Sequence, residues 1–261
     1  MSPGPPVAVA REAGLAIVTF DSPPLNLFDR ALEQGLVAAV DELEASPPRA
    51  VLFRAEGRAV SGGVDVALFA ELGGPEDATR TFEQLVAVAR RVDRLPCPTV
   101  FAAHGLCLTW AFELALACDL ILAAESASFG LVERVIGLTP AMGGTQRLAE
   151  RAGSGRAREF VMAGRPFPAR ELERWNVVNR VLDDEGFDEA CREFARNLAT
   201  GPTLAHAATK RVIRDYLEGG VELANDRVAA VAGELFASED LQGAVRSFLD
   251  QGPGKATFQG R

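Results

Sequence analysis

The sequence has few histidines and cysteines, and both shortages restrict the chemistry it can perform. Only His104 and His206 occur among 261 residues, so a histidine-based triad or metal cluster has little material, and we interpret both as core or surface imidazoles. The four cysteines form no CxxC pair, and a chain of this size needs no disulfides to stabilise it. We expect reduced, mostly buried thiols in a cytoplasmic protein.

Long apolar runs and a signal peptide are also lacking. The most apolar stretch, Leu114 to Ala124, is interrupted by Asp119 and is far shorter than the ~20 residues of a membrane-spanning helix. Residues 1–14 have neither the basic start nor the apolar segment of a signal peptide. With 27 basic and 36 acidic residues the net charge is −9, which repels polyanions. We therefore expect no nucleic-acid partner and no membrane partner.

Several common enzyme motifs do not occur. There is no GxxxxGK[ST], HExxH or GxSxG, and Gly153-Ser154-Gly155 lacks the later glycine of a dinucleotide-binding fingerprint. The composition, 48% apolar and 24% charged, is that of a globular protein with a sizeable core. One large domain, or one domain with an appendage, is the expectation.

The first half of the chain alternates strand-like and helical segments. Two amphipathic helices are expected, one capped by Asp29 and one ending before Pro96. The recurring order of strand, helix and strand favours an α/β fold with parallel pairing. The predicted strands are Val7 to Ala10, Leu15 to Phe20, Ala50 to Arg54 and Thr99 to Ala103.

From about residue 186 the strand pattern ends and helices follow. The predicted helices cover 187–199, 203–217, 221–236 and 238–250, with Ser238 as a start signal for the last. An α/β core followed by a helical tail must bury the apolar faces of that tail, and a second subunit is one way to do so.

Two glutamates lie in apolar surroundings that are unusual for a carboxylate. Glu113 is the only charged residue in the stretch from Thr109 to Cys118, and a buried glutamate is rare unless it is paired or functional. The alternative is that it complements the positive end of a helix dipole. Glu133 is a second candidate, and its alternative is an ordinary ion pair with Arg134.

A glycine-rich loop follows the strand at Ala50 to Arg54. In Ser61-Gly62-Gly63-Val64-Asp65 the glycines would let the backbone approach a ligand and direct N–H groups at it. The alternative is a tight turn without a ligand.

Five segments, in order, resemble the crotonase family over nearly the whole chain. Each motif alone is weak, but five in the right order and spacing are specific. They are Ser22-Pro23-Pro24-Leu25-Asn26, similar to NPP-x-N; Ser61 to Asp65; Glu113 to Asp119, similar to E-L-A-x-x-C-D; Phe129-Gly130 to Glu133; and Gly137 to Pro140 with Gly143 to Leu148, similar to G-x-x-P and G-G-T-x-R-L.

The resemblance implies a spiral of ββα turns in residues 1–186, with the acyl-CoA site, and a helical oligomerisation region in residues 187–261. Members assemble as trimers, usually stacked as hexamers. By position, the backbone N–H groups of Val64 and Trp110 would form an oxyanion hole for the thioester oxygen. Hydratases of the family use two glutamates, and Glu133 follows Glu113 by the required 20 residues.

The resemblance therefore implies reversible syn addition of water to a 2-enoyl-CoA. Glu113 and Glu133 would be catalytic and would share a proton near neutrality, with Glu133 as the donor to C2. No metal or redox cofactor is required, because coenzyme A is part of the substrate. The predicted substrate-binding residues are Arg58, Ala59, Ser61, Gly62, Gly63, Asp65 and Lys255; for Arg58 and Lys255 the alternative is solvated surface charge.

Three departures from the family pattern affect these expectations. Thr109-Trp110-Ala111-Phe112 replaces a glycine run, so the Trp110 indole either reshapes the acyl pocket or packs beneath the loop. Arg134 follows Glu133, and it would lower the Glu133 pKa unless it faces the other way, as neighbours on a strand do. The ending at residues 251–258 lacks the usual charged pattern.

Competing functions are double-bond isomerisation of a 3-enoyl-CoA, other acyl-CoA chemistry and a non-catalytic scaffold.

Overall fold

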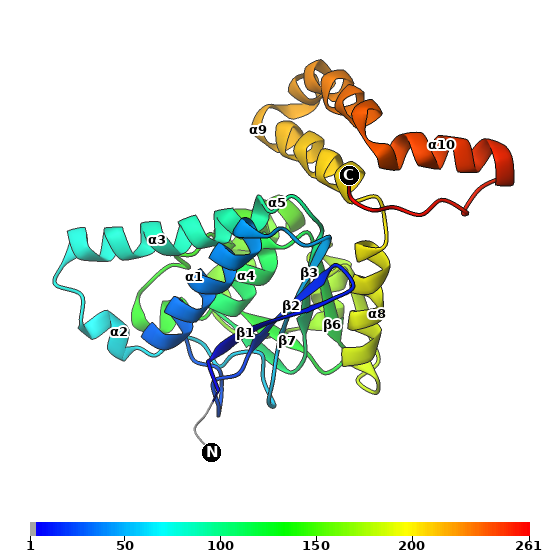
Figure 1. The fold of residues 1–261 in the computed structure, drawn as a ribbon. Coiled ribbons are helices and arrows are strands. Elements are labelled where there is room, and N and C mark those ends of the chain that lie inside the picture. The colour runs from blue at the N-terminus through cyan, green and yellow to red at the C-terminus, as the bar shows by residue number, and fades with distance from the viewer. Residues whose placement is uncertain (1–3) are drawn as a thin grey trace.

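The computed structural model describes residues 4–261, which form two sheets surrounded by helices (Figure 1). The larger sheet has the order β1-β2-β3-β4-β6-β9 and is parallel except for the β1–β2 pair. In the smaller sheet, β5-β7-β8, only the β7–β8 pair is antiparallel. The strands are β1 (Val7–Glu12), β2 (Leu15–Phe20), β3 (Ala50–Ala55), β4 (Thr99–Ala103), β5 (Leu106–Leu108), β6 (Leu120–Ala124), β7 (Ser128–Gly130), β8 (Phe167–Pro168) and β9 (Arg180–Leu182).

The predicted α/β class and the four predicted strands are confirmed. β3 and β4 are apolar along almost their whole length because helices cover the parallel sheet, as expected for buried parallel strands. Phe53 of β3 pairs in register with Phe101 of β4, and both rings are fully buried. The core therefore lies along the middle of the larger sheet.

A repeated unit of two strands and a helix links the two sheets. β4 turns at Gly105 into β5 and then α4, and β6 turns into β7 and then a 3₁₀ helix, η1. Gly105 has φ +58°, and an added Cβ would lie 2.5 Å from the Arg58 carbonyl oxygen, so only glycine fits this corner. Ser61 bridges Cys107 of β5, which adds the segment after β3 as another turn of the spiral.

The helices cover the sheets and begin where the sequence places start signals. Asp29 caps α1, its carboxylate accepting from the Leu32 N–H at 2.8 Å, as predicted. The helices are α1 (Arg30–Ala45), α2 (Ala67–Ala70), α3 (Pro75–Asp93), α4 (Trp110–Ala117), η1 (Glu133–Ile136), α5 (Gly144–Ala152), α6 (Ser154–Ala163), α7 (Ala169–Arg174), α8 (Phe187–Ala199), α9 (Thr203–Glu234), η2 (Leu235–Ala237) and α10 (Glu239–Gln251).

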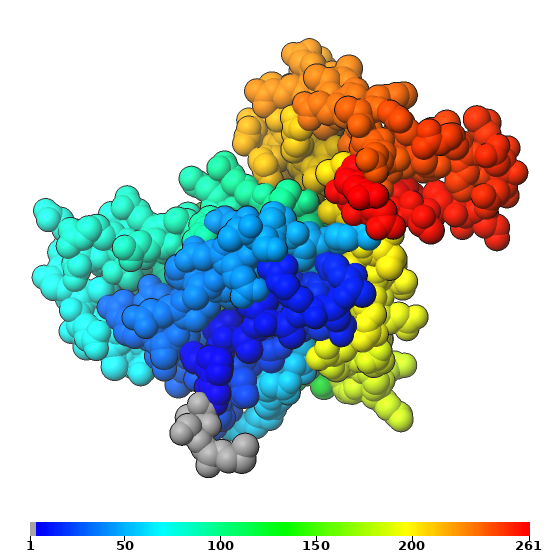
Figure 2. Space-filling model, in the orientation of Figure 1, coloured from blue at the N-terminus to red at the C-terminus, as the bar shows by residue number. Residues whose placement is uncertain are grey.

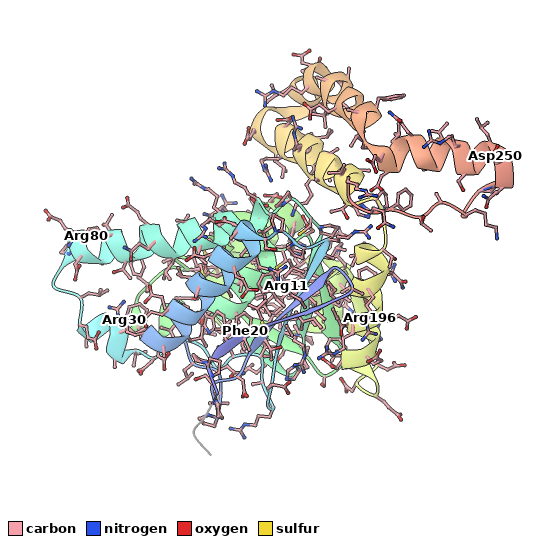
Figure 3. The ribbon with its side chains drawn as sticks, viewed as in Figure 1. Arg11, Phe20, Arg30, Arg80, Arg196 and Asp250 are labelled. Atoms are coloured by element: carbon pink, nitrogen blue, oxygen red, sulfur yellow. The ribbon has the colours of Figure 1, made fainter. Side chains whose placement is uncertain are left out.

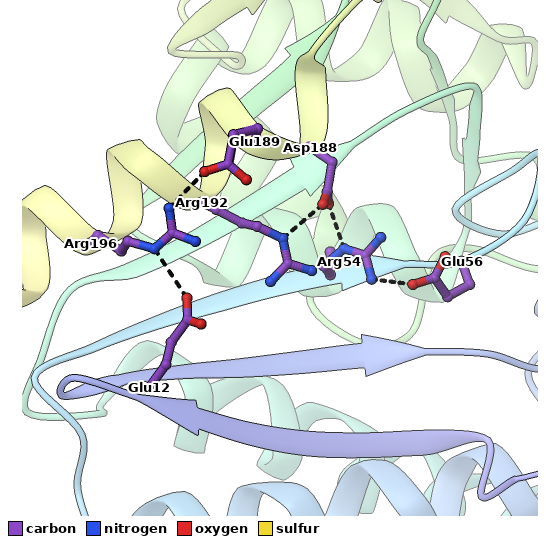
Figure 4. A network of polar contacts seen from close by, with 7 residues as sticks. All are labelled: Glu12, Arg54, Glu56, Asp188, Glu189, Arg192 and Arg196. Carbon is purple, nitrogen blue, oxygen red and sulfur yellow. Dashed lines mark hydrogen bonds and ion pairs between the residues drawn. The ribbon is translucent and has the colours of Figure 1, made fainter.

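α8 is fastened to the strands by a network of ion pairs (Figure 4). Asp188 contacts Arg54 of β3 and Arg192 of its own helix, both at 2.7 Å, and Arg196 contacts Glu12 of β1 at 3.2 Å. Exposed pairs of this kind stabilise little individually. Burial of the apolar face of α8 therefore contributes more to holding this helix on the core.

The start of α9 contacts the core, where Lys210 Nζ lies 2.8 Å from the Asp119 carboxylate and donates to the Cys97 carbonyl at 3.0 Å. The end of α9 and α10 project from the body of the molecule (Figures 1 and 2). α9 is broken at Gly219 and Gly220, which confirms the two separate helices predicted on either side. The Ser238 hydroxyl caps α10 by accepting from the Leu241 N–H at 3.1 Å. Large apolar side chains exposed here are Ile213, Tyr216, Leu217, Val221, Val228, Phe236, Val245, Phe248 and Leu249.

Two further expectations concern cysteines and the membrane. All four cysteines are buried and free, as predicted for core thiols. Within residues 4–261, no helix combines the length and the apolar character needed to cross a bilayer.

Candidate active site

One cavity contains both predicted catalytic glutamates and both predicted amide donors. Glu113, Glu133, Val64 and Trp110 all line it. Its remaining wall is mainly apolar and comes from the start of α1, from α2, α3 and the segment before α5. These lining residues are Phe28, Leu68, Phe69, Leu72, Phe82, Leu85, Leu138, Ala141 and Met142, with Arg30, Glu33 and Thr81 as polar members.

Glu113 is held in the core by backbone amides. It is 3% exposed, and its Oε2 accepts from the N–H groups of Met142 at 2.8 Å and Gly144 at 2.7 Å. Burial raises the pKa of Glu113, and the backbone amides of Gly144 and Met142 oppose that shift. An added Cβ at Gly144 would lie 2.6 Å from the Glu113 Cγ, so glycine is required at the start of α5.

Glu133 differs from Glu113 because one of its carboxylate oxygens has no hydrogen-bond partner within residues 4–261. Its Oε2 is buried and has no hydrogen-bond partner among the described residues. Burial, followed by the charge of Glu113, raises the pKa of Glu133 to about 7. A buried acceptor without a partner is costly and marks a candidate functional group.

Arg134 points away from Glu133, but not for the predicted reason. Glu133 begins the 3₁₀ helix η1, so the expected strand alternation does not apply. The Arg134 Nη1 instead donates to the carbonyls of Met162 at 2.6 Å and Ala163 at 3.0 Å, at the end of α6. Among residues 4–261 no ion pair joins Glu133 to Arg134, so the ordinary surface-pair alternative for Glu133 is wrong.

The backbone N–H groups of Val64 and Trp110 are both free of backbone partners in the described chain. Phe28 donates to the Gly63 carbonyl at 2.9 Å and accepts from Asp65 N–H at 3.0 Å. In this parallel bridge the Val64 N–H is turned away from Phe28. Trp110 is the first residue of α4, where helical N–H groups have no partner within the helix.

The other predicted binding residues lie outside the cavity wall. Arg58 and Asp65 are exposed, whereas Ala59, Ser61 and Gly63 are buried and Gly62 is half-buried. Lys255 is exposed in the C-terminal tail, which lies across the molecule from α2 and α3 in Figure 1. The structure thus places Glu113, Glu133, Val64 and Trp110 in one cavity wall. Ser61, Gly62, Gly63 and Asp65 belong to the same loop as Val64 but do not line the cavity, and neither do Arg58, Ala59 and Lys255.

Sequence reasoning missed the wall formed by α1, α2 and α3. Arg30 lies at the start of α1 near α2, and Arg80 lies near the start of α3, at its outer end (Figure 3). Arg30 pairs with Glu33 at 3.0 Å and contacts Glu71 at 3.7 Å. Phe82 and Leu85 showed the helical period that predicts a core face, and the same face turns out to line the cavity.

The chain matches the enoyl-CoA hydratase/isomerase family model over residues 10–261. A Bacillus subtilis (strain 168) protein named "Probable enoyl-CoA hydratase" is 30% identical over 261 residues, covering 97% of this chain and 98% of the relative. A carnitinyl-CoA dehydratase of Salmonella typhimurium is 33% identical over 82% of both chains. The structure of an enoyl-CoA hydratase subunit I from Geobacillus kaustophilus HTA426 superimposes with a TM-score of 0.90 at 31% identity, over 98% of each chain. The chain is a member of the enoyl-CoA hydratase/isomerase family, as its resemblance to crotonases predicted.

Proposed function

We propose that this protein is an enoyl-CoA hydratase that adds water reversibly to a 2-enoyl-CoA to give a 3-hydroxyacyl-CoA. The supporting observation is that the buried Glu113 and the half-buried Glu133 line one apolar cavity and differ in how their carboxylates are bonded. A carboxylate held by two amides favours its ionised form, whereas one without a partner favours its protonated form. In the proposed reaction Glu113 therefore serves as the base and Glu133 as the acid.

In the proposed reaction a water molecule lies between the two carboxylates. Glu113 accepts a proton from the water as its oxygen bonds to C3, and Glu133 delivers its own proton to C2. The π electrons of the C2–C3 bond move toward the thioester oxygen and return to form the C2–H bond. The proton on Glu113 then re-equilibrates to Glu133 through the next water.

The amides of Val64 and Trp110 serve as the proposed oxyanion hole. Negative charge develops on the thioester oxygen during attack at C3, and two unpaired N–H groups at the cavity wall suit that charge. Loss of one such donor costs about 3 kcal/mol in comparable enzymes.

The scheme uses no metal or redox group. Arg58 and Lys255 stay predicted contacts for the coenzyme A phosphates, and a cytoplasmic location stays a prediction.

The test is hydration of crotonyl-CoA and longer 2-enoyl-CoAs, followed by loss of the conjugated thioester absorbance. Glu113→Gln and Glu133→Gln should each lower kcat on the order of 10²-fold or more. Glu150→Gln, at an exposed position outside the cavity, is the matched control and should keep wild-type activity. A wild-type enzyme that hydrates no 2-enoyl-CoA would sink the proposal, and 3-enoyl-CoA isomerisation would be measured next.

The exposed apolar side chains of α9, η2 and α10 support a homotrimer or dimer of trimers. Phe236, Phe248 and Leu249 are 69%, 60% and 78% exposed, which is unusual for a helical region with no further role. Sedimentation equilibrium should give three or six times the 27.7 kDa chain mass. Phe248→Glu should shift the protein to smaller species, and a monomeric wild type would contradict this assembly.

A further inference from the structure

A buried side-chain hydrogen bond joins the two segments that carry the proposed oxyanion donors. Nε1 of Trp110 donates to Oγ of Ser61 over 2.7 Å. Trp110 is 3% exposed and Ser61 is fully buried, so water does not compete for this bond. The indole therefore connects the start of α4 with the loop that leads to Val64.

The Ser61 hydroxyl passes this restraint on to the loop. Besides the indole, Oγ accepts from the Gly63 N–H at 2.9 Å and donates to the Asn26 carbonyl at 2.9 Å, with the Gly63 carbonyl at 3.2 Å as a second, longer acceptor of the same proton. A hydroxyl has one proton and two lone pairs, so these bonds use its full capacity. Gly63 directly precedes Val64, and the bond to its N–H limits rotation of the backbone that orients the Val64 amide.

The indole cannot shift easily to follow a moving loop. Its ring packs edge-on against Phe20, with centroids 5.1 Å apart, and against Phe28 at 5.4 Å. Phe28 also pairs with the backbone on both sides of Val64. Trp110, Phe28 and the loop thus form one packed unit, and the indole fills the core beneath the loop.

The backbone entering α4 is strained at the neighbouring residue. Thr109 has φ +49° and ψ −119°, which is a rare conformation for a β-branched residue, and its buried Oγ1 has no partner among residues 4–261. Its side chain abuts the loop, since a Cβ at Gly63 would meet Thr109 Oγ1 at 3.6 Å. Such strain persists only where the surroundings over-determine the geometry, and the Trp110–Ser61 bond is part of those surroundings.

Resting on the proposed function, we propose that the Trp110 side chain is a positioning group that fixes the spacing of the Val64 and Trp110 amides through Ser61. The indole N–H does not touch substrate; it acts through the loop. An oxyanion hole stabilises the developing charge only when its donors are already oriented toward it. Loosening the loop should therefore reduce kcat and leave the binding of the ground-state thioester nearly unchanged.

The test compares Trp110→Phe, which keeps an aromatic ring but removes the N–H, with Ser61→Ala and the double variant. Each single variant should lower kcat about 10-fold, with KM within about twofold. The kcat of the double variant should be no lower than that of the less active single variant, because the two substitutions remove the same hydrogen bond. Trp175→Phe is the matched control, since the other tryptophan of the chain is buried against Phe167 away from the cavity and should keep wild-type kcat.

A spectroscopic measurement separates positioning from a general loss of stability. The absorption band of bound hexa-2,4-dienoyl-CoA should move to longer wavelength in the wild type, because the two amides draw electron density onto the thioester oxygen. Folded Trp110→Phe and Ser61→Ala enzymes should both show a smaller shift. Wild-type kcat and an unchanged band in these variants would overturn the inference. A wild-type enzyme that hydrates no 2-enoyl-CoA, or whose kcat is unaffected by Glu113→Gln and Glu133→Gln, would instead be the failure of the hydratase proposal.

Discussion

Glu113 and Glu133 line one cavity, yet the Oε2 of Glu113 accepts hydrogen bonds from the amides of Met142 and Gly144, whereas the Oε2 of Glu133 has no partner in residues 4–261. The two amides stabilise charge on Glu113, and that charge in turn disfavours ionisation of Glu133. Two carboxylates coupled in this way titrate together, and their apparent pKa values belong to the pair. The bonding difference supports the proposed roles of Glu113 as base and Glu133 as acid.

The pH dependence of kcat/KM should have an alkaline limb near pH 7. The pKa of Glu133 is raised to about 7 by burial and by Glu113, so the proton that Glu133 donates is lost above that pH. We expect kcat/KM for crotonyl-CoA to fall as pH rises from 7 to 9. Steady-state kinetics across pH 5–9 measure this. A profile flat to pH 9 would show that a protonated Glu133 is not needed.

The stability of Glu133→Gln relative to wild type should increase with pH. The folded-state pKa of Glu133 is about 7, against an ordinary value near 4.5, so the folded state binds the proton more tightly. The stability that proton binding by Glu133 contributes to the wild type is therefore lost as pH rises from about 4.5 through 7. Glutamine does not titrate, so Glu133→Gln undergoes no such loss. Allowing for partial exposure, Glu133→Gln should gain about 2 kcal/mol between pH 4.5 and pH 8.

Urea unfolding of wild type and Glu133→Gln at the two pH values measures this gain. Glu83→Gln, at an exposed position of α3, is the control and should show no comparable gain. An equal stability difference at pH 4.5 and pH 8 would mean that Glu133 ionises in the folded protein as easily as in the unfolded chain.

Much of the fold was predictable because its elements carry local signals. The apolar runs of β2, β3 and β4 and the Asp29 and Ser238 caps all depend on neighbours within a few residues. The motif resemblance added the order of the spiral turns. The two helices of the C-terminal tail were separable because Gly219-Gly220 interrupts the apolar pattern.

The site was predictable only in part, because much of it depends on backbone groups and distant contacts. The embedded carboxylate of Glu113 was visible in the sequence, but the Met142 and Gly144 amides that hold it have no side-chain signature. The turn of Arg134 toward the end of α6 follows from η1, a short helix that no periodicity reveals. The Trp110–Ser61 bond joins residues 49 apart, which spacing cannot foresee.

Asn26 should be a strong determinant of stability at the base of the glycine-rich loop. It is 3% exposed, and its Nδ2 donates to the carbonyls of Glu56 at 3.0 Å and Ala59 at 3.1 Å. Asn26→Ala leaves these buried acceptors unpaired and should cost about 3 kcal/mol. Asn26→Asp should cost more at pH 7 than at pH 5, because an ionised carboxylate would face two carbonyl oxygens.

Urea unfolding at pH 5 and pH 7 measures both Asn26 variants. Asn197→Ala, at an exposed position of α8, is the control and should lie within about 0.5 kcal/mol of wild type. Stability close to wild type in Asn26→Ala would show that the loop does not depend on this amide.

Phe82 should limit the length of the acyl group. Its ring centroid lies 6.4 Å from that of Phe69, and both side chains line the apolar cavity that the glutamates also line. Phe82→Ala removes wall volume, so the ratio of kcat/KM for 2-octenoyl-CoA to that for crotonyl-CoA should rise on the order of 10-fold. Val86→Ala, one turn along α3 and outside the cavity wall, should leave the ratio unchanged. If Phe82→Ala also leaves it unchanged, the acyl chain follows another wall of the cavity.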